Sequence, residues 1–381
     1  MLRHTAVLAL AAPRRVLAVA ALLTVALAVF GVPVAKSLSP SGFADPGSES
    51  ARASRILTDT FGQGDVSMLI VVSSPDGIDS PHVRDAGKRI AERVAADPHV
   101  AVVSSAWTTP PAAATDLVSR DRTAGLVVAG ITGNEADQQT YAKQIADEVT
   151  RDVPAGVTVR TGGTAMVNVQ ITEQSQRDLV LVEGLAIPLR FLVLVWVFGG
   201  LVAAELPVAI GGMAIIGGLA VLRLVTFTTD VSIFALNLTT AMGLALAIDY
   251  TLLILSRYRE ELAAGAQRRE AIRRTMTTAG RTVTFSATTV ALSMVAMVLF
   301  PMHFLKSFAY AGVATVAFAA AAAVVVTPAA LALLGDRIDA FDVHRLSRRI
   351  LRRPDPVPVP VEQRFWYRCA KFVMRRALAL R

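Results

Sequence analysis

Six long apolar segments constrain this chain more than any other feature of its sequence. A helix that crosses a membrane needs about 20 apolar residues. The segments that satisfy this length are 16–34, 179–198, 201–222, 231–255, 282–301 and 307–334. Only 18% of the residues are charged and 53% are hydrophobic, whereas soluble domains carry about 25% charged residues. The sequence therefore predicts a polytopic α-helical membrane protein with one span, a long gap and then five spans.

The first apolar segment has two interpretations, because Arg14 and Arg15 precede it as basic residues precede a secretory signal. A signal peptide has an apolar core of about 7–15 residues and a cleavage site of small residues. This segment is longer and lacks a clear site of that kind, which favours a retained anchor. The chain then divides into four parts: 1–35, a cytoplasmic start and first span; 36–177, an extracytoplasmic domain; 178–335, a five-span bundle; and 336–381, a basic cytoplasmic tail.

The distribution of basic residues predicts the orientation, because Lys and Arg collect in cytoplasmic loops. The amino terminus holds three, the loop after the fourth span seven and the tail twelve, which is 22 of 38, whereas the opposite short loops hold only Arg223 and Lys306. We therefore expect a cell-membrane protein with both termini in the cytoplasm. The outer segment carries 13 basic and 17 acidic residues. The net charge of +8 thus reflects topology, and no nucleic-acid partner is expected.

Several kinds of site are absent from the sequence. Cys369 is the single cysteine, which excludes an intrachain disulfide and a cysteine-based metal site. The five histidines show no paired spacing, and no lysine follows the pattern of a nucleotide-binding loop. Neither a nucleophile elbow nor a base-and-nucleophile arrangement is present. We expect no cofactor, no metal, no enzymatic activity and an energy source other than ATP.

The outer segment alternates between strand and helix patterns. Strands are predicted at 67–73, 99–105, 123–131 and 157–161, and helices at 80–97 and 135–153. The order βαββαβ is that of a split βαβ, ferredoxin-like α+β unit. After the last strand, Gly162 and Gly163 lead into a helix from about Thr164 that can continue into the second span. The outer domain is therefore expected to be tied to the membrane at both ends.

Asp249 lies inside the fourth apolar segment, toward the cytoplasmic end. A carboxylate at membrane depth costs about 2.5–3.5 kcal/mol on insertion scales, so it marks a functional position by default. A carboxyl group in an apolar setting can bind and release a proton near neutral pH. Tyr250 beside it offers a phenol as a hydrogen-bond partner. We predict that Asp249 and Tyr250 form a proton relay. The alternative is that Asp249 forms a structural ion pair with Arg190 and has no role in proton transfer.

The second apolar segment contains Glu183 and Arg190, which are seven residues apart and hence on one helix face. An unpaired arginine near mid-membrane is as costly as an aspartate. Arg190 is therefore expected to neutralise Asp249, or to face an aqueous cleft or an anionic lipid headgroup. The plainer alternative is that Arg190 extends to an interface from a tilted helix.

Hydroxyl side chains follow one another along the fifth apolar segment at a depth that could meet Asp249. Those that could support the relay are Ser286, Thr289 and Ser293. Hydroxyls at helical spacing in membranes more often serve helix packing than proton transfer. Both interpretations stay open on the sequence alone.

Four blocks of the sequence form a recognisable set. They are GLALAIDY followed by SRYREEL at 243–262, RRTMTTAGRTVTFS at 273–286, TDVSIFALNL at 229–238 and TPAALALLG at 327–335. With the layout of the spans, these blocks resemble the amino-terminal half of the MMPL family of the resistance-nodulation-division (RND) superfamily. The resemblance implies that the Asp-Tyr pair of the fourth span, here Asp249 and Tyr250, relays protons. It also implies twelve spans in a full member and an equivalent pair in the tenth.

Export of a lipid or hydrophobic small molecule, driven by the proton motive force, is the function that this resemblance implies. We expect protons, membrane lipids and the exported molecule as ligands. The chain has six spans, and the segment 367–380 repeats the basic and apolar layout of residues 3–16, so we expect a half-size transporter that pairs with a second half or with copies of itself. The alternative is a non-transporting partner or assembly module, or the remnant of a split gene. An intramembrane hydrolase that uses Asp249 is not expected, because the sequence has no second catalytic carboxylate at the right depth.

Overall fold

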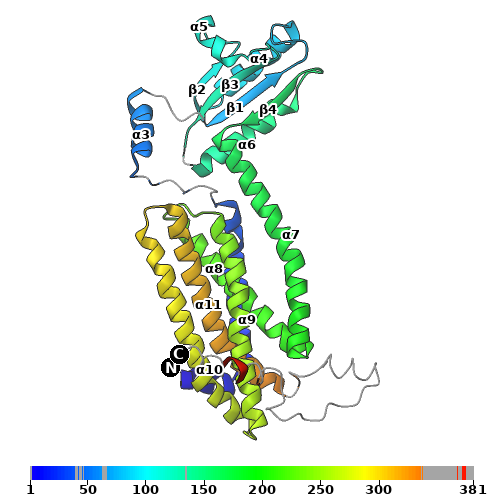
Figure 1. The fold of residues 1–381 in the computed structure, drawn as a ribbon, viewed down its shortest axis with the longest axis vertical. Helices are drawn as coiled ribbons and strands as arrows, with labels where there is room; N and C mark the ends of the chain where they lie inside the picture. The colour runs from blue at the N-terminus through cyan, green and yellow to red at the C-terminus, as the bar shows by residue number, and fades with distance from the viewer. Residues whose placement is uncertain are drawn as a thin grey trace, which may run out of the picture.

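The computed structural model describes residues 2–38, 42, 45, 47–61, 67–133, 135–335, 337, 367 and 371–374. Most of the tail from residue 336, including most of the segment 367–380 that repeats the start of the chain, lies outside the described residues. In the described part, a helical bundle carries a separate α+β domain on one end (Figure 1).

Helices make up most of the molecule. The α-helices are α1 (Leu2–Ala11), α2 (Pro13–Gly31), α3 (Glu49–Phe61), α4 (Pro81–Ala95), α5 (Pro111–Ala114), α6 (Glu135–Arg151), α7 (Thr164–Phe198), α8 (Leu201–Val225), α9 (Phe234–Ala263), α10 (Arg268–Val295) and α11 (His303–Leu334). Short 3-10 helices are η1 (Val32–Lys36), η2 (Thr115–Leu117) and η3 (Ala296–Leu299). Six helices in this described part are long and apolar enough to cross a membrane: α2 with η1, α7, α8, α9, α10 with η3, and α11. Each of the six predicted apolar segments therefore lies on a helix of spanning length.

Helices α8, α9 and α11 form the packed centre of the bundle, because small residues let their backbones approach. A Cβ atom at Gly218 would lie 2.7 Å from both Thr239 Cγ2 and Thr315 Oγ1. A Cβ atom at Gly243 would lie 2.8 Å from Ile215 Cγ1. Interfaces of small residues are the usual means of helix association in membranes. These contacts fix the position of α9, the helix that carries Asp249.

The outer domain is a four-stranded sheet covered on one face by α4 and α6. Its strands are β1 (Met68–Ser73), β2 (Val100–Ser105), β3 (Ala124–Ile131) and β4 (Thr158–Gly162), in the order β2-β3-β1-β4 with antiparallel pairing throughout. Side chains from the strands, from both helices and from the first turns of α7 make one apolar core. The four predicted strands and two predicted helices are all present, with ends that shift by one or two residues.

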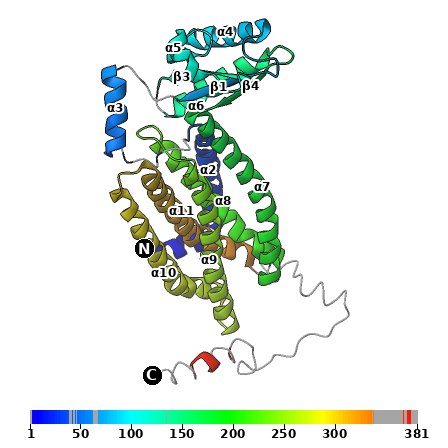
Figure 2. The ribbon, with the colours of Figure 1, turned by 45° about the horizontal axis from the view of Figure 1, so that its top comes forward.

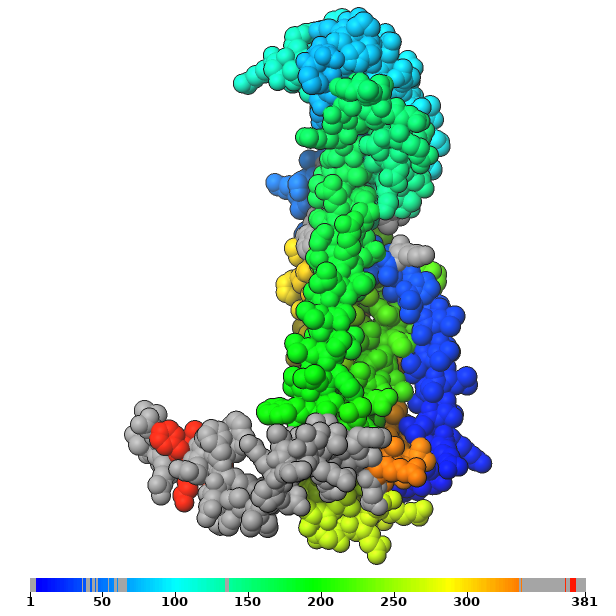
Figure 3. All heavy atoms as spheres, turned by 90° about the vertical axis from the view of Figure 1, so that its right-hand side faces the viewer, coloured from blue at the N-terminus to red at the C-terminus, as the bar shows by residue number. Residues whose placement is uncertain are grey.

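Helix α7 connects the sheet to the membrane without a break. Its 35 residues span about 50 Å at about 1.5 Å per residue, which exceeds the roughly 30 Å of a hydrocarbon core. The turn that enters it depends on Gly163, whose φ is +93° and whose Cβ would lie 2.7 Å from the Ser67 carbonyl oxygen. Figure 3 shows α7 as a continuous column from the outer domain down the side of the bundle.

Helices α1 and α3 were not anticipated from the sequence. Helix α1 is separate from the first span because Pro13 begins α2 and the preceding Ala12 is not helical. Helix α3 follows the first span and stands apart from the outer domain and from the bundle (Figure 2). Neither has the length of a span, which is why a search for long apolar segments does not find them.

Candidate functional site

Asp249 lies near the middle of α9 and faces outward from the bundle. The exposed positions of α9 recur at four-residue intervals, so they form one stripe along the helix. The members of this α9 stripe are Asn237, Ala241, Ala245, Asp249 and Leu253. Within the described part of the chain, Asp249 has no ion pair and no hydrogen bond. A carboxylate at this depth is thus accessible to groups from outside the six-helix bundle.

Tyr250 points the opposite way, into the bundle. It is 4% exposed and packs in the main apolar cluster of the membrane helices. Its hydroxyl has no hydrogen-bond partner of good geometry among the described residues, and Ser286 on α10 is the side chain that interacts with it at longer range. A buried phenol without a full partner can accept or pass a hydrogen bond when a neighbour moves. The structure therefore brings Tyr250 and Ser286 together.

The other two hydroxyls predicted to support a relay bond to their own helix. Thr289 donates to the Phe285 carbonyl oxygen at 3.0 Å, and Ser293 donates to the Thr289 carbonyl oxygen at 3.0 Å. Both side chains are exposed on α10. Such bonds to the preceding turn satisfy a hydroxyl without a partner on another helix. In this arrangement neither side chain contacts Asp249 through a hydrogen bond.

Glu183 and Arg190 form an ion pair within α7. Arg190 Nη1 lies 3.0 Å from Glu183 Oε2. Two turns of helix separate the residues, so their long side chains reach one another along one face. The structure thus pairs Arg190 with Glu183, and the predicted pairing of Arg190 with Asp249 is wrong. The charge of Arg190 is satisfied without any contribution from the rest of the bundle.

A second ion-pair network lies at the end of α9 that is predicted to be cytoplasmic. Glu261 is 7% exposed and accepts from Arg257 at 2.5 Å and from Arg274 on α10 at 3.5 Å. Arg259 donates to the Phe198 carbonyl oxygen at the end of α7. The sequence alone does not reveal this network, because a run of Arg and Glu at a helix end does not show which member is buried. These bonds tie α9 to α10 and to α7.

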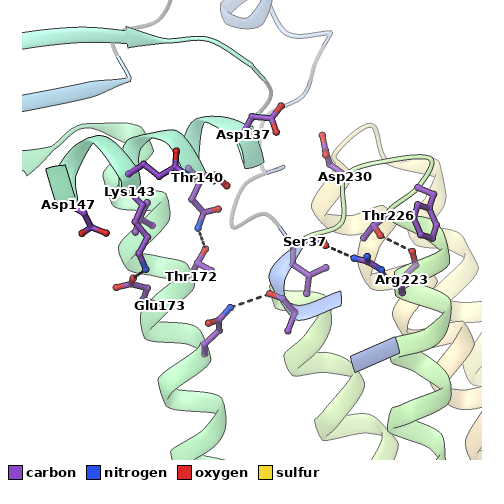
Figure 4. Close-up of a pocket in the computed structure, with 17 residues that line it drawn as sticks. Ser37, Asp137, Thr140, Lys143, Asp147, Thr172, Glu173, Arg223, Thr226 and Asp230 are labelled. Carbon is purple, nitrogen blue, oxygen red and sulfur yellow. Dashed lines mark hydrogen bonds and ion pairs between the residues drawn. The ribbon is translucent and has the colours of Figure 1, made fainter. Parts of the chain in front are cut away.

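An open cavity separates the outer domain from the outer end of the bundle (Figure 4). Its volume is about 750 Å³, and its walls come from α6, α7, η1, α8 and the loop before α9. We call it the junction cavity. Its lining is rich in charge, with residues such as Asp137, Lys143, Glu173, Arg223 and Asp230. A space of this size and polarity can hold a polar group of a small molecule.

Hydrogen bonds across the junction cavity define two sides. On one side, Lys143 of α6 pairs with Glu173 of α7, and the hydrogen bond from this carboxylate raises the pKa of Lys143. On the other side, Arg223 of α8 donates to Ser37 at 2.5 Å. Gln176 of α7 bridges the two sides through a 3.2 Å bond to the Ala35 carbonyl oxygen. The outer domain and α7 are therefore joined firmly to each other and more lightly to the bundle.

The described residues contain no group of three or more His, Cys, Asp or Glu side chains arranged to hold a metal ion. The arrangement consists instead of an accessible carboxylate in the middle of α9, a buried phenol beside it and a polar cavity between the sheet domain and the helical bundle. These are parts suited to binding protons and amphiphilic molecules, and they lie on helices that connect one part to another.

The chain is similar to known membrane transporters. It is 35% identical to the trehalose monomycolate exporter MmpL3 of Mycolicibacterium smegmatis over 378 residues, which is 92% of this chain and 37% of that protein. It is 36% identical to the trehalose monomycolate exporter MmpL3 of Mycobacterium tuberculosis H37Rv, over 84% of this chain and 34% of the relative. It is 28% identical to the mycolic acid-containing lipids exporter MmpL11 of M. smegmatis, over 90% of this chain and 35% of the relative. The chain thus spans roughly a third of the length of these curated relatives.

A crystal structure of a heavy metal efflux pump has the same fold in part. The TM-score is 0.50 at 15% sequence identity, over 72% of this chain and 36% of the pump. The model of the MMPL family matches residues 42–380. With six apolar helices of spanning length and relatives that are exporters, the chain is a multi-pass cell-membrane protein and belongs to the MMPL family.

Proposed function

We propose that this chain acts in proton-driven export of a lipid or hydrophobic small molecule, as one six-span half of an RND-type transporter. The observation that carries the proposal is Asp249, a carboxylate at the middle of a spanning helix that no other described group neutralises. A carboxylate at membrane depth is costly unless it is used. Relatives named as lipid exporters support the same function.

The proposed relay consists of Asp249 and Tyr250. Asp249 takes up a proton and loses its charge, which removes the cost of exposing it to an apolar surface. Tyr250, on the inner side of the same turn of α9, and Ser286 of the neighbouring α10 are expected to respond to that change. A proton that crosses 100 mV releases about 2.3 kcal/mol before any pH term. That free energy is enough to shift a bundle with two arrangements of similar stability.

The proposed orientation places both termini in the cytoplasm and the sheet domain outside the cell. Its βαββαβ order and antiparallel sheet are those of a ferredoxin-like unit. The abundance of basic residues at the α9–α10 connection supports this orientation by the positive-inside rule. Movement of the bundle then reaches the outer domain through α7, which is continuous from β4 to the membrane.

The junction cavity is the proposed site for the polar end of the exported molecule. It opens at the outer end of the membrane helices, where an amphiphile presents its headgroup. The α9 stripe is the proposed contact for a second half-transporter chain or a second copy of this chain. Its small residues above Asp249 allow a partner helix to approach closely.

Transport by the chain in proteoliposomes tests the proposal. The probe is a fluorescent trehalose monomycolate analogue, because two of the relatives export that lipid. We expect transport that depends on an imposed proton gradient, that is lost in Asp249→Asn and that persists in Asp152→Asn, an exposed outer-domain control. Transport without a gradient, or undiminished transport in Asp249→Asn, would contradict the relay.

Infrared difference spectroscopy tests proton binding separately from transport. We expect a protonated-carboxyl band that appears as pH falls in the purified chain and is missing in Asp249→Asn. If the band is present but no lipid moves, the non-transporting partner or assembly role replaces transport as the function of this chain by itself. If the band is absent, Asp249 is not a proton carrier.

A further inference from the structure

The outer domain contains a second open cavity, at the end of the sheet where β1 and β2 finish. Its volume is about 750 Å³, and its walls come from the loop after β1, from α4, from the segment after β2 that includes α5 and η2, and from the loop before β3. We call it the distal cavity, because α5 lies at the end of the outer domain farthest from the bundle (Figure 1). It is separate from the junction cavity, with which it shares no lining residue.

The distal cavity is strongly basic in a domain that is acidic overall. Its charged lining residues are Asp79, Arg84, Lys88, Arg120 and Arg122. The sequence of the whole outer segment, by contrast, has 17 acidic and 13 basic residues. Four cations around one carboxylate leave an excess of positive charge at the cavity. Such a local reversal of sign attracts anions from solution.

Two of the four cations are held in place and two are available. Asp79 accepts from Arg122 at 2.7 Å and lies 3.6 Å from Arg84. Lys88 and Arg120 have no ion pair among the described residues. One carboxylate thus orients two guanidinium groups, while two further cations remain free for a ligand. Arginine forks match the oxygen geometry of phosphate and carboxylate groups.

The backbone at Arg122 has a left-handed conformation that orients its side chain toward Asp79. Arg122 is the one non-glycine residue with a positive φ, 56°, in the described part of the chain. Its amide donates to the Ser119 carbonyl oxygen and its own carbonyl accepts from Ile78, both at 2.9 Å. A left-handed conformation is unfavourable for a residue with a side chain and is maintained where surrounding bonds impose it, often at binding sites. Here it directs the Arg122 side chain to Asp79.

A tryptophan supplies an apolar surface beside the cations. Trp107 lines the distal cavity, and its ring lies over two glycines. A Cβ atom at Gly87 would be 2.4 Å from the ring, and one at Gly125 would be 2.5 Å from it. The indole nitrogen donates to the Ile78 carbonyl oxygen at 3.5 Å. Both glycines are therefore required for the ring position, and the cavity combines a fixed aromatic wall with free cations.

We propose that the distal cavity binds a small molecule that carries a phosphate group beside a planar or apolar portion. Lys88 and Arg120 bind the phosphate group, and the ring of Trp107 packs against the planar or apolar portion. The volume falls in the range of about 300–1,000 Å³ that is typical of small-molecule sites. A lipid that is still seated in the bilayer does not reach this end of the domain, so the ligand is either soluble or already extracted from the membrane. The proposal is independent of the transport function.

Calorimetric titration of the purified full chain with phenyl phosphate tests the proposal. We expect binding that weakens at least tenfold in Lys88→Gln/Arg120→Gln. The matched control is Arg151→Gln/Arg160→Gln, which makes the same charge change on the same domain outside both cavities and should bind within twofold of the unmodified chain. Inorganic phosphate should bind more weakly than phenyl phosphate, and phenol should not bind.

Dihexanoyl phosphatidylglycerol distinguishes the source of the phosphate. If this soluble lipid competes with phenyl phosphate and is also sensitive to Lys88→Gln/Arg120→Gln, the cavity accepts an extracted phospholipid. If it does not compete, the ligand is a soluble phosphorylated molecule, which equally supports the proposal. Absence of phenyl phosphate binding, equal loss in both variants, or binding of polyglutamate alone would overturn it. Circular dichroism of each variant confirms that the comparison is between folded proteins.

Discussion

Helices α7 and α9 each carry an acidic residue within a membrane span, but the carboxylate is ion-paired in α7 and unpaired in α9 among the described residues. In α7, Glu183 lies 3.0 Å from Arg190 on the same helix. In α9, Asp249 has no such partner among the described residues and lies on an exposed stripe. Helix α9 is packed against α8, α10 and α11, whereas no residue of α7 between Val169 and Leu194 is buried.

The difference shows where neutralisation comes from in each span. A helix with few neighbours must satisfy its own charges, which α7 does with a pair two turns apart. A helix in the centre of a bundle is held by its packed side and can leave a carboxylate open on the other. The packing of α9 against its neighbours is therefore compatible with an uncompensated Asp249, and the ion pair of α7 is compatible with a loosely packed span.

The largest expected effect comes from removing each charge in turn. Asp249→Asn should reduce proton-driven lipid transport to the background of empty vesicles, because the amide cannot carry a proton. The double variant Glu183→Gln/Arg190→Gln should retain transport within a few-fold, because it removes both members of a self-contained pair. Initial rates in proteoliposomes measure both. Equal losses in the two variants would show that the spans do not differ in function.

The packed and open sides of α9 should differ in stability. Ala247→Val adds volume at a fully buried position and should lower the free energy of unfolding by about 1–3 kcal/mol, the usual cost of overpacking. Ala245→Val makes the same change on the α9 stripe and should have little effect. Denaturant unfolding of the purified chain in detergent measures both. A destabilised Ala245→Val variant would mean that this stripe is covered.

A smaller effect is expected within α7. Glu183→Gln and Arg190→Gln should each lower the free energy of unfolding, because each single change leaves one charge in the membrane without its partner. The sum of the two losses should exceed the loss in the double variant. A double-mutant cycle should give a coupling energy of about 1 kcal/mol, obtained from unfolding of the two single variants and the double variant. A coupling energy of zero would indicate that water, and not Glu183, satisfies Arg190.

The smallest effect concerns a paired carboxylate outside the membrane. The hydrogen bond from Arg122 lowers the pKa of Asp79 below the usual 3.8. Since the folded pKa is the lower one, the stabilisation is complete above about pH 3.8 and is lost as the pH falls through the folded value. Fluorescence of Trp107, with the other two tryptophans replaced by Phe, reports this loss because the ring lies beside this loop.

Asp79→Asn should remove that step of the pH titration. Asp85→Asn, on the exposed face of α4, should leave the step unchanged and serves as the control. A step that persists in Asp79→Asn would assign the titration to another group. The contrast between paired and open carboxylates would then not extend to the outer domain.

Much of the architecture could be predicted from the sequence because its signals are local. Hydrophobic length marks six spans, and the alternating periods of residues 67–161 mark four strands and two helices. Asp249 was identified from its apolar surroundings alone. The seven-residue spacing placed Glu183 and Arg190 on one helix face, but Asp249 was the acidic partner expected for Arg190. Deciding between them required knowing that α7 stands away from most of the bundle.

The features that were missed depend on contacts between distant segments. Glu261 is buried and lies 3.5 Å from Arg274 of another helix. The distal cavity combines residues from four separate segments, and Arg122 takes its unusual backbone conformation from bonds to Ser119 and Ile78. The local sequence around Glu261 and around Arg122 does not indicate the ion pair, the cavity or the backbone conformation, because each depends on residues that are distant in the chain.

The sequence by itself determined that the chain crosses a membrane six times, carries an α+β domain after the first span and places one acidic residue in the fourth. Hydrophobicity and periodicity decide these points, and both are properties of continuous segments. Tertiary structure alone decided which side of α9 each residue faces, so that Tyr250 is buried and Asp249 is open. Adjacent residues on a helix lie about 100° apart, and only the positions of the neighbouring helices determine which of those directions is filled.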